Sequence, residues 1–431
     1  MTDLMKRPGE LDQSYGEKGI CNLQIDGYLN AMAEGRNGYQ HFVYVAGTTR
    51  LRPGESKKYF LARLTEGGKL DASFGGGVIT GEFSPGFDSQ VFSLAVQKNG
   101  KIVISGDFDY RSAALARFDM DGSLDDGFGE NGVKILDPSK VYEADKEKFI
   151  PESSVRSSGA FGQANMVLLA DGKILLVHTN RKGNRHQLIR LEANGDLDLS
   201  FQKEGFIDIT APAPWRMMRV TGLGIQETRG GEKLIVSGYC TKLTEDGQDT
   251  ISAGIFARYD MSGFKDESFK GKGFFVLEHI KELEILGITI LPTGKIYGFG
   301  RTPPPHLGGG TLSDAVIVRL GEDGSPEVYK VIAKQNELEF YSGAVQKKDN
   351  KIVVAGTWYS PRGDLGVVGR YHENGTPDVE FGHESSLDGI IWFPDVGYGR
   401  CARIQEDGLI LVSGAVNYQG HSSAAVLRYM S

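Results

Sequence analysis

The sequence has little cysteine, no surplus of basic charge and no long apolar segment. Its 431 residues include three cysteines, Cys21, Cys240 and Cys401, which lie far apart and form no CxxC pair. This spacing offers no zinc site and is typical of a protein kept in a reducing compartment. We therefore expect small core or loop residues at these positions and no structural metal.

Further absences concern membranes and nucleic acids. No apolar run approaches the roughly 20 residues that a membrane helix needs, and Met1–Glu10 lacks the apolar core of a secretory signal. The formal net charge is -8, whereas phosphate contacts need concentrated Lys and Arg. We expect no membrane or nucleic-acid partner, and a cytoplasmic location, with export by a route that needs no signal left open.

One unit is repeated along the whole chain. Its clearest motif is LDxSFGxxG, which occurs as LDQSYGEKG from Leu11, LDASFGGG from Leu70, LDDGFGENG from Leu124 and LDLSFQKEG from Leu197. Weaker copies are KDESFKGKG from Lys265, PDVEFG from Pro377 and the degenerate SPEVYK from Ser325. Such self-similarity indicates a repeat architecture. We expect one domain over residues 1–431, with units of about 11–69, 70–123, 124–196, 197–264, 265–324, 325–376 and 377–431.

Two further motifs recur within each unit. The first is a strand preceded by a Gly turn, such as NGKIVISG from Asn99 or DNKIVVAG from Asp349, and the second is a strand with one Arg, such as LARF from Leu115. Both are short apolar runs without polar alternation, which favours strands covered on both faces. The Asn-Gly and Asp-Gly pairs suit tight hairpins. The seven arginines are Arg63, Arg117, Arg190, Arg258, Arg319, Arg370 and Arg428.

The second unit predicts four strands, at about Phe92–Gln97, Lys101–Phe108, Ala113–Asp119 and Gly132–Leu136. Four strands in each of seven units are typical of a propeller. A solenoid would need polar capping units at both ends, and we see none. The expected fold is an all-β, seven-bladed β-propeller with four antiparallel strands per blade, whose ring is closed by pairing of the N- and C-terminal strands. We expect a monomer.

These motifs resemble the delta-60 repeat family, which is also catalogued as a β-propeller domain of unknown function. The resemblance rests on LDxSFGxxG, on the DGKI-type strand and on the turn that follows the Arg strand. It extends from Leu11 to Tyr429 and implies a propeller fold. The family carries no known catalytic residues that could be assigned here.

The repeated polar residues are interpreted as structural. The motif Asp is expected to bind backbone N–H groups of its own turn, and each strand Arg to pair with a motif Asp or with turn carbonyls, because a charge between blades needs a partner. Asp119, Asp121 and Asp125 resemble part of a calcium loop but lack its distal Glu, so a plain turn is expected. His178, which stands where most units have Gly, is interpreted as a packing residue.

Variable segments are predicted to share one face, because antiparallel strands alternate in direction. The tight turns and LDxSFG turns would lie on one face, and the loops after each second strand and the crossings between blades on the other. Aromatic and Arg side chains gather in these variable segments, where binding residues are often found. The expected ligand-binding residues are Trp358, Tyr359, Arg301, Arg181, Arg185, Tyr418 and Trp215.

Three classes of function fit the sequence. The favoured hypothesis is a non-enzymatic binding propeller that holds an unidentified ligand or protein partner on the variable face. The alternatives are a hydrolase or lyase that acts on a sugar- or peptide-like substrate in the axial depression, and a structural module of a larger assembly. The sequence has no P-loop, HExxH or GxSxG motif, so we assign no catalytic residue, cofactor or metal.

Overall fold

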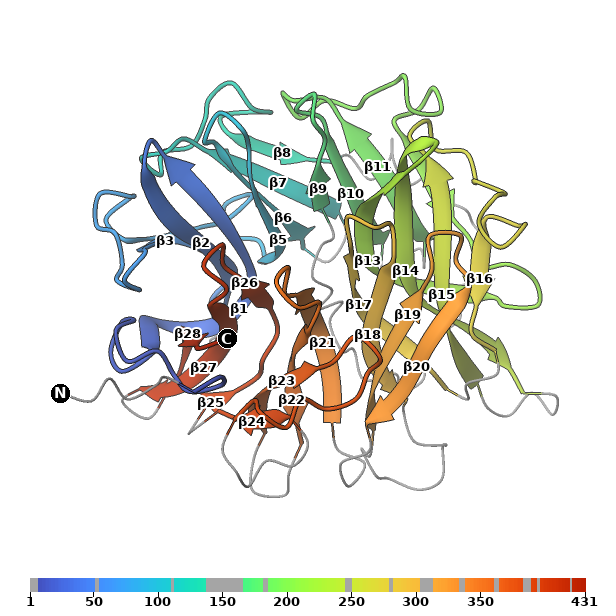
Figure 1. Cartoon of the computed structure of the whole chain (residues 1–431). Coiled ribbons are helices and arrows are strands. Elements are labelled where there is room, and N and C mark those ends of the chain that lie inside the picture. The colour runs from blue at the N-terminus through green and yellow to red at the C-terminus, as the bar shows by residue number, and fades with distance from the viewer. Residues whose placement is uncertain are drawn as a thin grey trace.

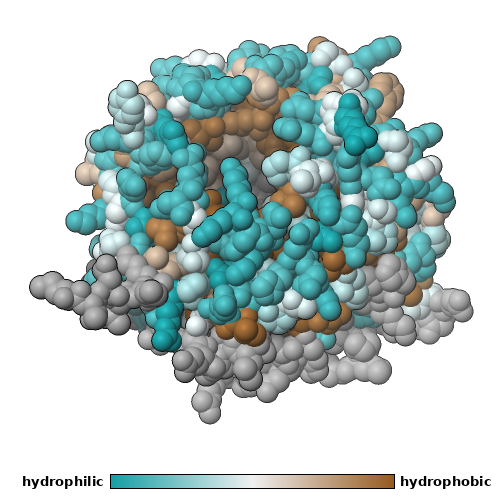
Figure 2. Space-filling view, viewed as in Figure 1, coloured by the Kyte–Doolittle hydropathy of each residue, from teal (hydrophilic) through white to brown (hydrophobic). Residues whose placement is uncertain are grey.

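The computed structural model describes most of the chain as β-strands. The described residues are 7–50, 54–109, 112–136, 166–180, 185–244, 250–278, 282–302, 313–332, 338–359, 364–382, 389–393, 396–418 and 421–431. They form six antiparallel sheets arranged around a central axis (Figure 1). Figure 2 shows a hollow near the centre of one face, with hydrophobic residues along part of its rim. The described part of the chain contains no helix long and apolar enough to cross a membrane.

Five of the sheets are four-stranded blades. Their strands are β5 (Ser89–Val96), β6 (Ile102–Phe108), β7 (Ser112–Phe118) and β8 (Val133–Ile135); β9 (Met166–Leu168), β10 (Ile174–Asn180), β11 (Arg185–Leu191) and β12 (Phe206–Ile209); β13 (Met217–Thr228), β14 (Gly231–Leu243), β15 (Thr250–Asp260) and β16 (Phe274–Val276); β17 (Glu284–Ile290), β18 (Ile296–Thr302), β19 (Asp314–Leu320) and β20 (Pro326–Ile332); and β21 (Leu338–Val345), β22 (Ile352–Trp358), β23 (Leu365–Tyr371) and β24 (Ile390–Trp392). The β5–β8 blade agrees closely with the four strands predicted for the second unit.

The sixth sheet has eight strands. They are β1 (Ile20–Asn37), β2 (Gln40–Thr49), β3 (Tyr59–Thr65), β4 (Val78–Gly81), β25 (Val396–Gly397), β26 (Ala402–Ile404), β27 (Ile410–Tyr418) and β28 (His421–Tyr429). The first part of β1 pairs with β28, with Ile20 opposite Leu427, and its second part pairs with β2, with Gly27 opposite Thr49.

The prediction of seven separate four-stranded blades closed into a ring is therefore wrong. The described strands form five such blades and one eight-stranded sheet. The physical reason is the length of β1, which continues for 18 residues without a break and joins the first and last units into one sheet. Sequence motifs mark the units but do not show whether a strand stops between two of them.

Hydrophobic side chains fill the spaces between sheets. Six clusters in the described residues lie between successive sheets, and a seventh lies inside the eight-stranded sheet. The innermost strands β1, β5, β9, β13, β17, β21 and β26 follow one another around the axis, each in contact with the next along this series. The motif aromatic is completely buried in six copies, as Phe74 and Phe201 illustrate, and Tyr329 of the degenerate copy is partly buried.

A recurring arginine ties most units to the next sheet or turn. Arg63 donates from Nε to Asp71 Oδ2 (2.8 Å), from Nη2 to Ser73 Oγ (2.9 Å) and from Nη1 to the carbonyl of Met120 in the next blade (2.6 Å). Its guanidinium also lies 4.9 Å from the centre of the Phe74 ring. The prediction that the strand Arg pairs with a motif Asp or turn carbonyls is confirmed, since one side chain does both. We call this set of contacts the arginine lock.

Most units repeat the arginine lock. Equivalent Arg–Asp ion pairs are Arg117–Asp125, Arg190–Asp198, Arg258–Asp266, Arg370–Asp378 and Arg428–Asp12. Burial alone raises the pKa of Asp12, but hydrogen bonds from Ser14 and the Arg428 guanidinium outweigh it and lower the pKa to about 2. Ser14 donates to Asp12 Oδ1 through both its backbone N–H and its hydroxyl, so the predicted turn role of the motif Asp is also confirmed.

The arginine lock predicts a large loss of stability when its carboxylate is neutralised. Asp198 is almost completely buried and accepts from both Arg190 and Lys173. We expect Asp198→Asn to lower the free energy of unfolding by about 3–5 kcal/mol, because it leaves a buried guanidinium without its counter-charge. Urea unfolding followed by fluorescence would measure this.

The matched control is Asp196→Asn in the same turn. The Asp196 side chain is 63% exposed and pairs with Lys134, so its loss should cost at most about 1 kcal/mol. Equal stability of the two variants would contradict the structural role of the arginine lock.

Candidate functional site

The strand register defines two ends of the molecule. Ser89, which opens β5, lies opposite Phe108, which closes β6, and Phe108 lies opposite Ser112, which opens β7. The loops after each second strand and the connections between sheets therefore meet at one end, as predicted. We call it the long-loop end, and the opposite end, which carries the Gly turns and the LDxSFG turns, the short-turn end.

Arg301 links two blades at the long-loop end. It lies at the end of β18 and pairs with Glu284 Oε2 on β17 (2.7 Å) and with Glu339 on β21 of the next blade. Ser313 donates its hydroxyl to Glu339 Oε1 (3.0 Å). Burial alone lowers the pKa of Arg301, but the two carboxylates raise it above its usual range. The guanidinium is therefore a permanent charge clamped between two acids.

Two tyrosines extend this cluster toward the loops. Tyr341 donates its hydroxyl to Glu339 Oε2 (2.6 Å), and the Tyr341 and Tyr359 hydroxyls lie 2.6 Å apart. Burial, reinforced by the Glu339 carboxylate, raises the pKa of Tyr359 well above its usual value. Both pKa values are raised, so both hydroxyls stay protonated at neutral pH, and their protons are shared within the cluster of Glu339, Tyr341 and Tyr359.

Arg400 occupies the same end of the eight-stranded sheet. Its Nη1 donates to Asn30 Oδ1 (2.9 Å), and its guanidinium lies 4.7 Å from the centre of the Tyr28 ring and 5.5 Å from that of Tyr398. Tyr398 donates its hydroxyl to Asp364 Oδ2 (2.9 Å). Burial and this carboxylate raise the pKa of Tyr398 to about 12. Burial lowers the pKa of Arg400, and the electrostatic influence of Tyr341 and Tyr359 partly offsets this, so the two clusters influence each other.

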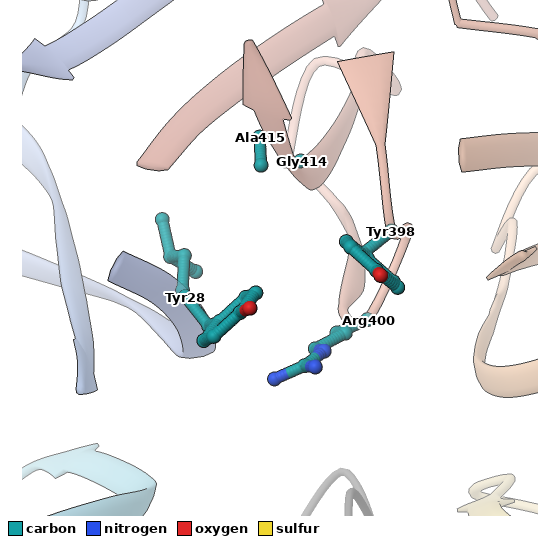
Figure 3. A pocket seen from close by; sticks show the side chains of 6 residues that line it. Tyr28, Tyr398, Arg400, Gly414 and Ala415 are labelled. Atoms are coloured by element: carbon teal, nitrogen blue, oxygen red, sulfur yellow. The ribbon is translucent and has the colours of Figure 1, made fainter. Parts of the chain in front are cut away.

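Figure 3 shows Tyr28, Tyr398 and Arg400 around a shallow recess. Gly414 and Ala415 on β27 also line it. Tyr398 has a φ of 61°, which is uncommon for a bulky residue and is often found at functional sites. We call the residues around Arg301 and Arg400 the arginine–tyrosine arc: Tyr28, Asn30, Glu284, Arg301, Glu339, Tyr341, Tyr359, Tyr398 and Arg400.

Irregular inner strands create this arc. The register of β1 shifts between Leu29 and Ala31, and that of β21 shifts between Phe340 and Ser342, so that Asn30 and Tyr341 lie at bulges. A bulge re-aims a side chain that regular pleating would point elsewhere. Asn30 uses its position to donate from Nδ2 to the carbonyl of Val91 in the next blade (2.7 Å).

Glycine makes room for the bulges on the neighbouring strands. A Cβ on Gly356 of β22 would lie 2.0 Å from the Glu339 carbonyl oxygen, and one on Gly300 of β18 would lie 1.9 Å from that of Glu284. No side chain fits at these distances. In these two blades the final Gly of the DGKI-type motif is therefore required by the close approach of the inner strand.

The structure brings together two of the seven predicted ligand-binding residues. Arg301 and Tyr359 both contact Glu339. Trp358 lies apart and packs on Trp392, with ring centres 4.8 Å apart. Trp215 is buried in the core cluster that joins the β9–β12 and β13–β16 blades. Arg181 lies outside the described residues, as do the side chains of Arg185 and Tyr418.

The sequence analysis missed the acidic and polar members of the arc. Glu284, Glu339 and Tyr341 belong to inner strands whose other residues are mostly apolar, as in LEFYSGAV. A carboxylate within such an apolar run is the signal that indicates these residues, because a buried acid needs a cation as its partner. Tyr28 and Asn30 give no comparable signal, since polar and apolar residues alternate along β1.

The carboxylates of the calcium-like turn all bind groups of the protein. Asp121 accepts from the backbone N–H and the hydroxyl of Ser123, Asp125 pairs with Arg117 and Lys101, and Asp119 pairs with Lys101. These contacts agree with the predicted plain turn. Across the described ranges, no group of three or more His, Cys, Asp or Glu residues is placed to hold a metal ion.

Residues 97–128, 169–201 and 347–381 match the family model described as "Domain of unknown function (DUF5122) beta-propeller". Each of these segments contains one DGKI-type strand, one Arg strand and the start of one LDxSFG-type motif, up to its Phe. The chain is thus similar to a propeller family of unknown function. A comparison with curated proteins finds no match.

Solved structures similar to this chain include other propellers. The β-propeller domain of the Trilobed protease from Pyrococcus furiosus is 9% identical with a TM-score of 0.45, and the match covers 94% of this chain and 93% of that one. Sqt1 from Chaetomium thermophilum is 10% identical with a TM-score of 0.45, over 95% and 97% of the two chains. Values this low imply nothing about a shared activity.

The network around Glu339 gives a test of how the arc is held. We expect Glu339→Gln to lower the free energy of unfolding by about 1.5–3 kcal/mol, because hydrogen bonds to a charged group are replaced by bonds to a neutral amide. Chemical denaturation would measure the change. As a control, Glu406→Gln removes the exposed Arg36–Glu406 pair and should change stability by less than about 1 kcal/mol. If both variants are equally stable, Glu339 does not organise the arc.

Proposed function

We propose that this protein is a non-enzymatic binding propeller that holds a ligand or protein partner at the long-loop end. The observation that carries the proposal is the arginine–tyrosine arc. Arginine and tyrosine are the side chains that most often dominate binding energy, because they combine a large planar surface with directional hydrogen bonds. Here they are gathered from three sheets to the end where the variable loops lie.

The state of these side chains supports binding more than catalysis. The Tyr359 and Tyr398 hydroxyls have raised pKa values, so they act as hydrogen-bond donors at neutral pH and are poor nucleophiles or bases. Arg301 is held between two carboxylates. A pre-organised surface of this kind reduces the conformational entropy that is lost when a ligand binds.

We further infer that the repeated units are delta-60 units. The inference rests on the LDxSFG and DGKI-type motifs, which recur beyond the three segments that the family model matches. The arginine lock supports it, because the lock uses residues from both the Arg strand and the LDxSFG turn in most units.

Binding at the arc can be tested by screening chemically diverse ligands. Labelled protein would be applied to glycan and peptide arrays, and every hit would be repeated with the variant Tyr28→Ala. Tyr28 is half-buried and lies against Arg400, so its truncation should weaken binding at least about tenfold while leaving the fold intact. Melting temperatures would check that the variant is folded.

Tyr39→Ala is the matched control. Tyr39 is fully exposed at the tip of the β1–β2 hairpin, at the short-turn end. We expect this variant to bind every hit like the wild type. Binding that survives Tyr28→Ala but is lost in Tyr39→Ala would place the site at the other end and overturn the proposal.

A further inference from the structure

The β9–β12 blade carries a buried histidine on each of its two faces. His178 on β10 faces the preceding blade, where its Nε2 lies 2.9 Å from Asp107 Oδ1. Thr179, the next residue, must face the opposite way, because side chains alternate along a strand. His186 on β11 lies opposite Thr179, and its Nδ1 is 2.8 Å from Thr179 Oγ1. His186 therefore faces the β13–β16 blade.

The surroundings of His186 disfavour a charged imidazole. The side chain is 4% exposed, and its Nε2 has no hydrogen-bond partner within the described ranges. The titratable groups that act on it are Arg219 on β13 and His178 on β10, and Asp208 on β12 is engaged by Gln187. Burial, followed by Arg219 and His178, lowers the pKa of His186 to about 3.

The two ends of this seam are held by different contacts. At the short-turn end, Arg190 donates to the carbonyl of Met261, and Gln202 Nε2 donates to the carbonyl of Ser262 (2.8 Å). At the long-loop end, His186 lies opposite Ile209 on β12, which belongs to the apolar core that the two blades share. Polar cross-links thus fix one end, whereas at the other end the described contacts include apolar packing beside the His186 imidazole.

We propose that the long-loop end of the seam between the β9–β12 and β13–β16 blades is an acid-sensitive latch that opens when His186 takes up a proton. The closed seam excludes the proton, whereas an opened seam exposes the imidazole to water, where it titrates near its ordinary pKa of about 6.5. The closed form is therefore fully favoured above about pH 6.5. Below that value the open population rises about tenfold per pH unit, down to about pH 3. This device is independent of the proposed binding function.

Native-state hydrogen exchange of the full chain would test the latch. Exchange rates, corrected for the intrinsic pH dependence, would be compared between about pH 7 and about pH 4.5 for the amides of residues 186–188 and 218–220. We expect the opening equilibrium at these amides to increase about 100-fold over this range. Amides near Leu191 and Met261, at the short-turn end of the same seam, should show a much smaller change.

Two variants separate His186 from the other histidines. His186→Asn retains an amide that can bond Thr179 but cannot titrate, so its opening should be independent of pH. His41→Asn removes an exposed histidine on β2 and should open like the wild type. A wild-type seam without pH dependence, or His186→Asn with an unchanged slope, would refute the latch.

A spectroscopic measurement covers the case in which His186→Asn does not fold. The imidazole nitrogens of His186 in the wild-type protein would be followed by NMR at about pH 5, where a neutral ring is expected in the closed seam. A charged imidazolium together with full amide protection at residues 186–188 would show that the closed seam accepts the proton. That result would also refute the latch.

Discussion

The arginine lock is the interaction on which the arrangement of sheets depends. Hydrophobic packing brings successive sheets together, but it is non-directional and does not fix how far one sheet slides along the next. A guanidinium bonded to a carboxylate of its own unit and to a turn carbonyl of the next fixes that offset, because hydrogen bonds form only over a narrow range of distance and angle. Arg428, which pairs with Asp12 and donates to the Glu66 carbonyl, applies the same constraint where the two ends of the chain meet.

The position of the arginine lock explains why the two ends of the molecule differ. Every lock includes an LDxSFG turn or its substitute, so the short-turn end is held by the same contacts in unit after unit. In the described residues, no such contact repeats at the long-loop end. The contacts there differ between sheets: two carboxylates pair with Arg301, tyrosine rings lie against Arg400, and a carboxylate lies beside His178. Residues at that end can therefore change without loss of the offset between sheets.

Sequence reasoning was reliable where one contact repeats and unreliable where a contact occurs once. Three features could be predicted: the four strands of the second unit, the two ends of the molecule, and the roles of the motif Asp and Arg. Every copy of the repeat occupies the same environment, so the copies together reveal the pattern that this environment requires. The continuous β1 strand could not be predicted, since pairing on both sides of one strand produces no distinctive pattern in its residues. Glu339 and Tyr341 were missed because their partners, Arg301 and Tyr359, are distant in sequence and meet through bulges.

The degenerate unit shows what the arginine lock requires. SPEVYK lacks the turn of the other copies, so the chain enters its outer strand at once, and β20 has 7 residues where β8, β16 and β24 have 3. Arg319 has no motif Asp, yet it pairs with Glu327 of β20 and Glu373 of the next blade and donates to the Glu373 carbonyl. The element that Arg319 shares with the other locks is therefore an anion within reach of the guanidinium, joined in most units by a carbonyl of the next turn. The LDxSFG turn supplies the anion as an aspartate in most units. In the degenerate unit, a longer outer strand supplies it as a glutamate.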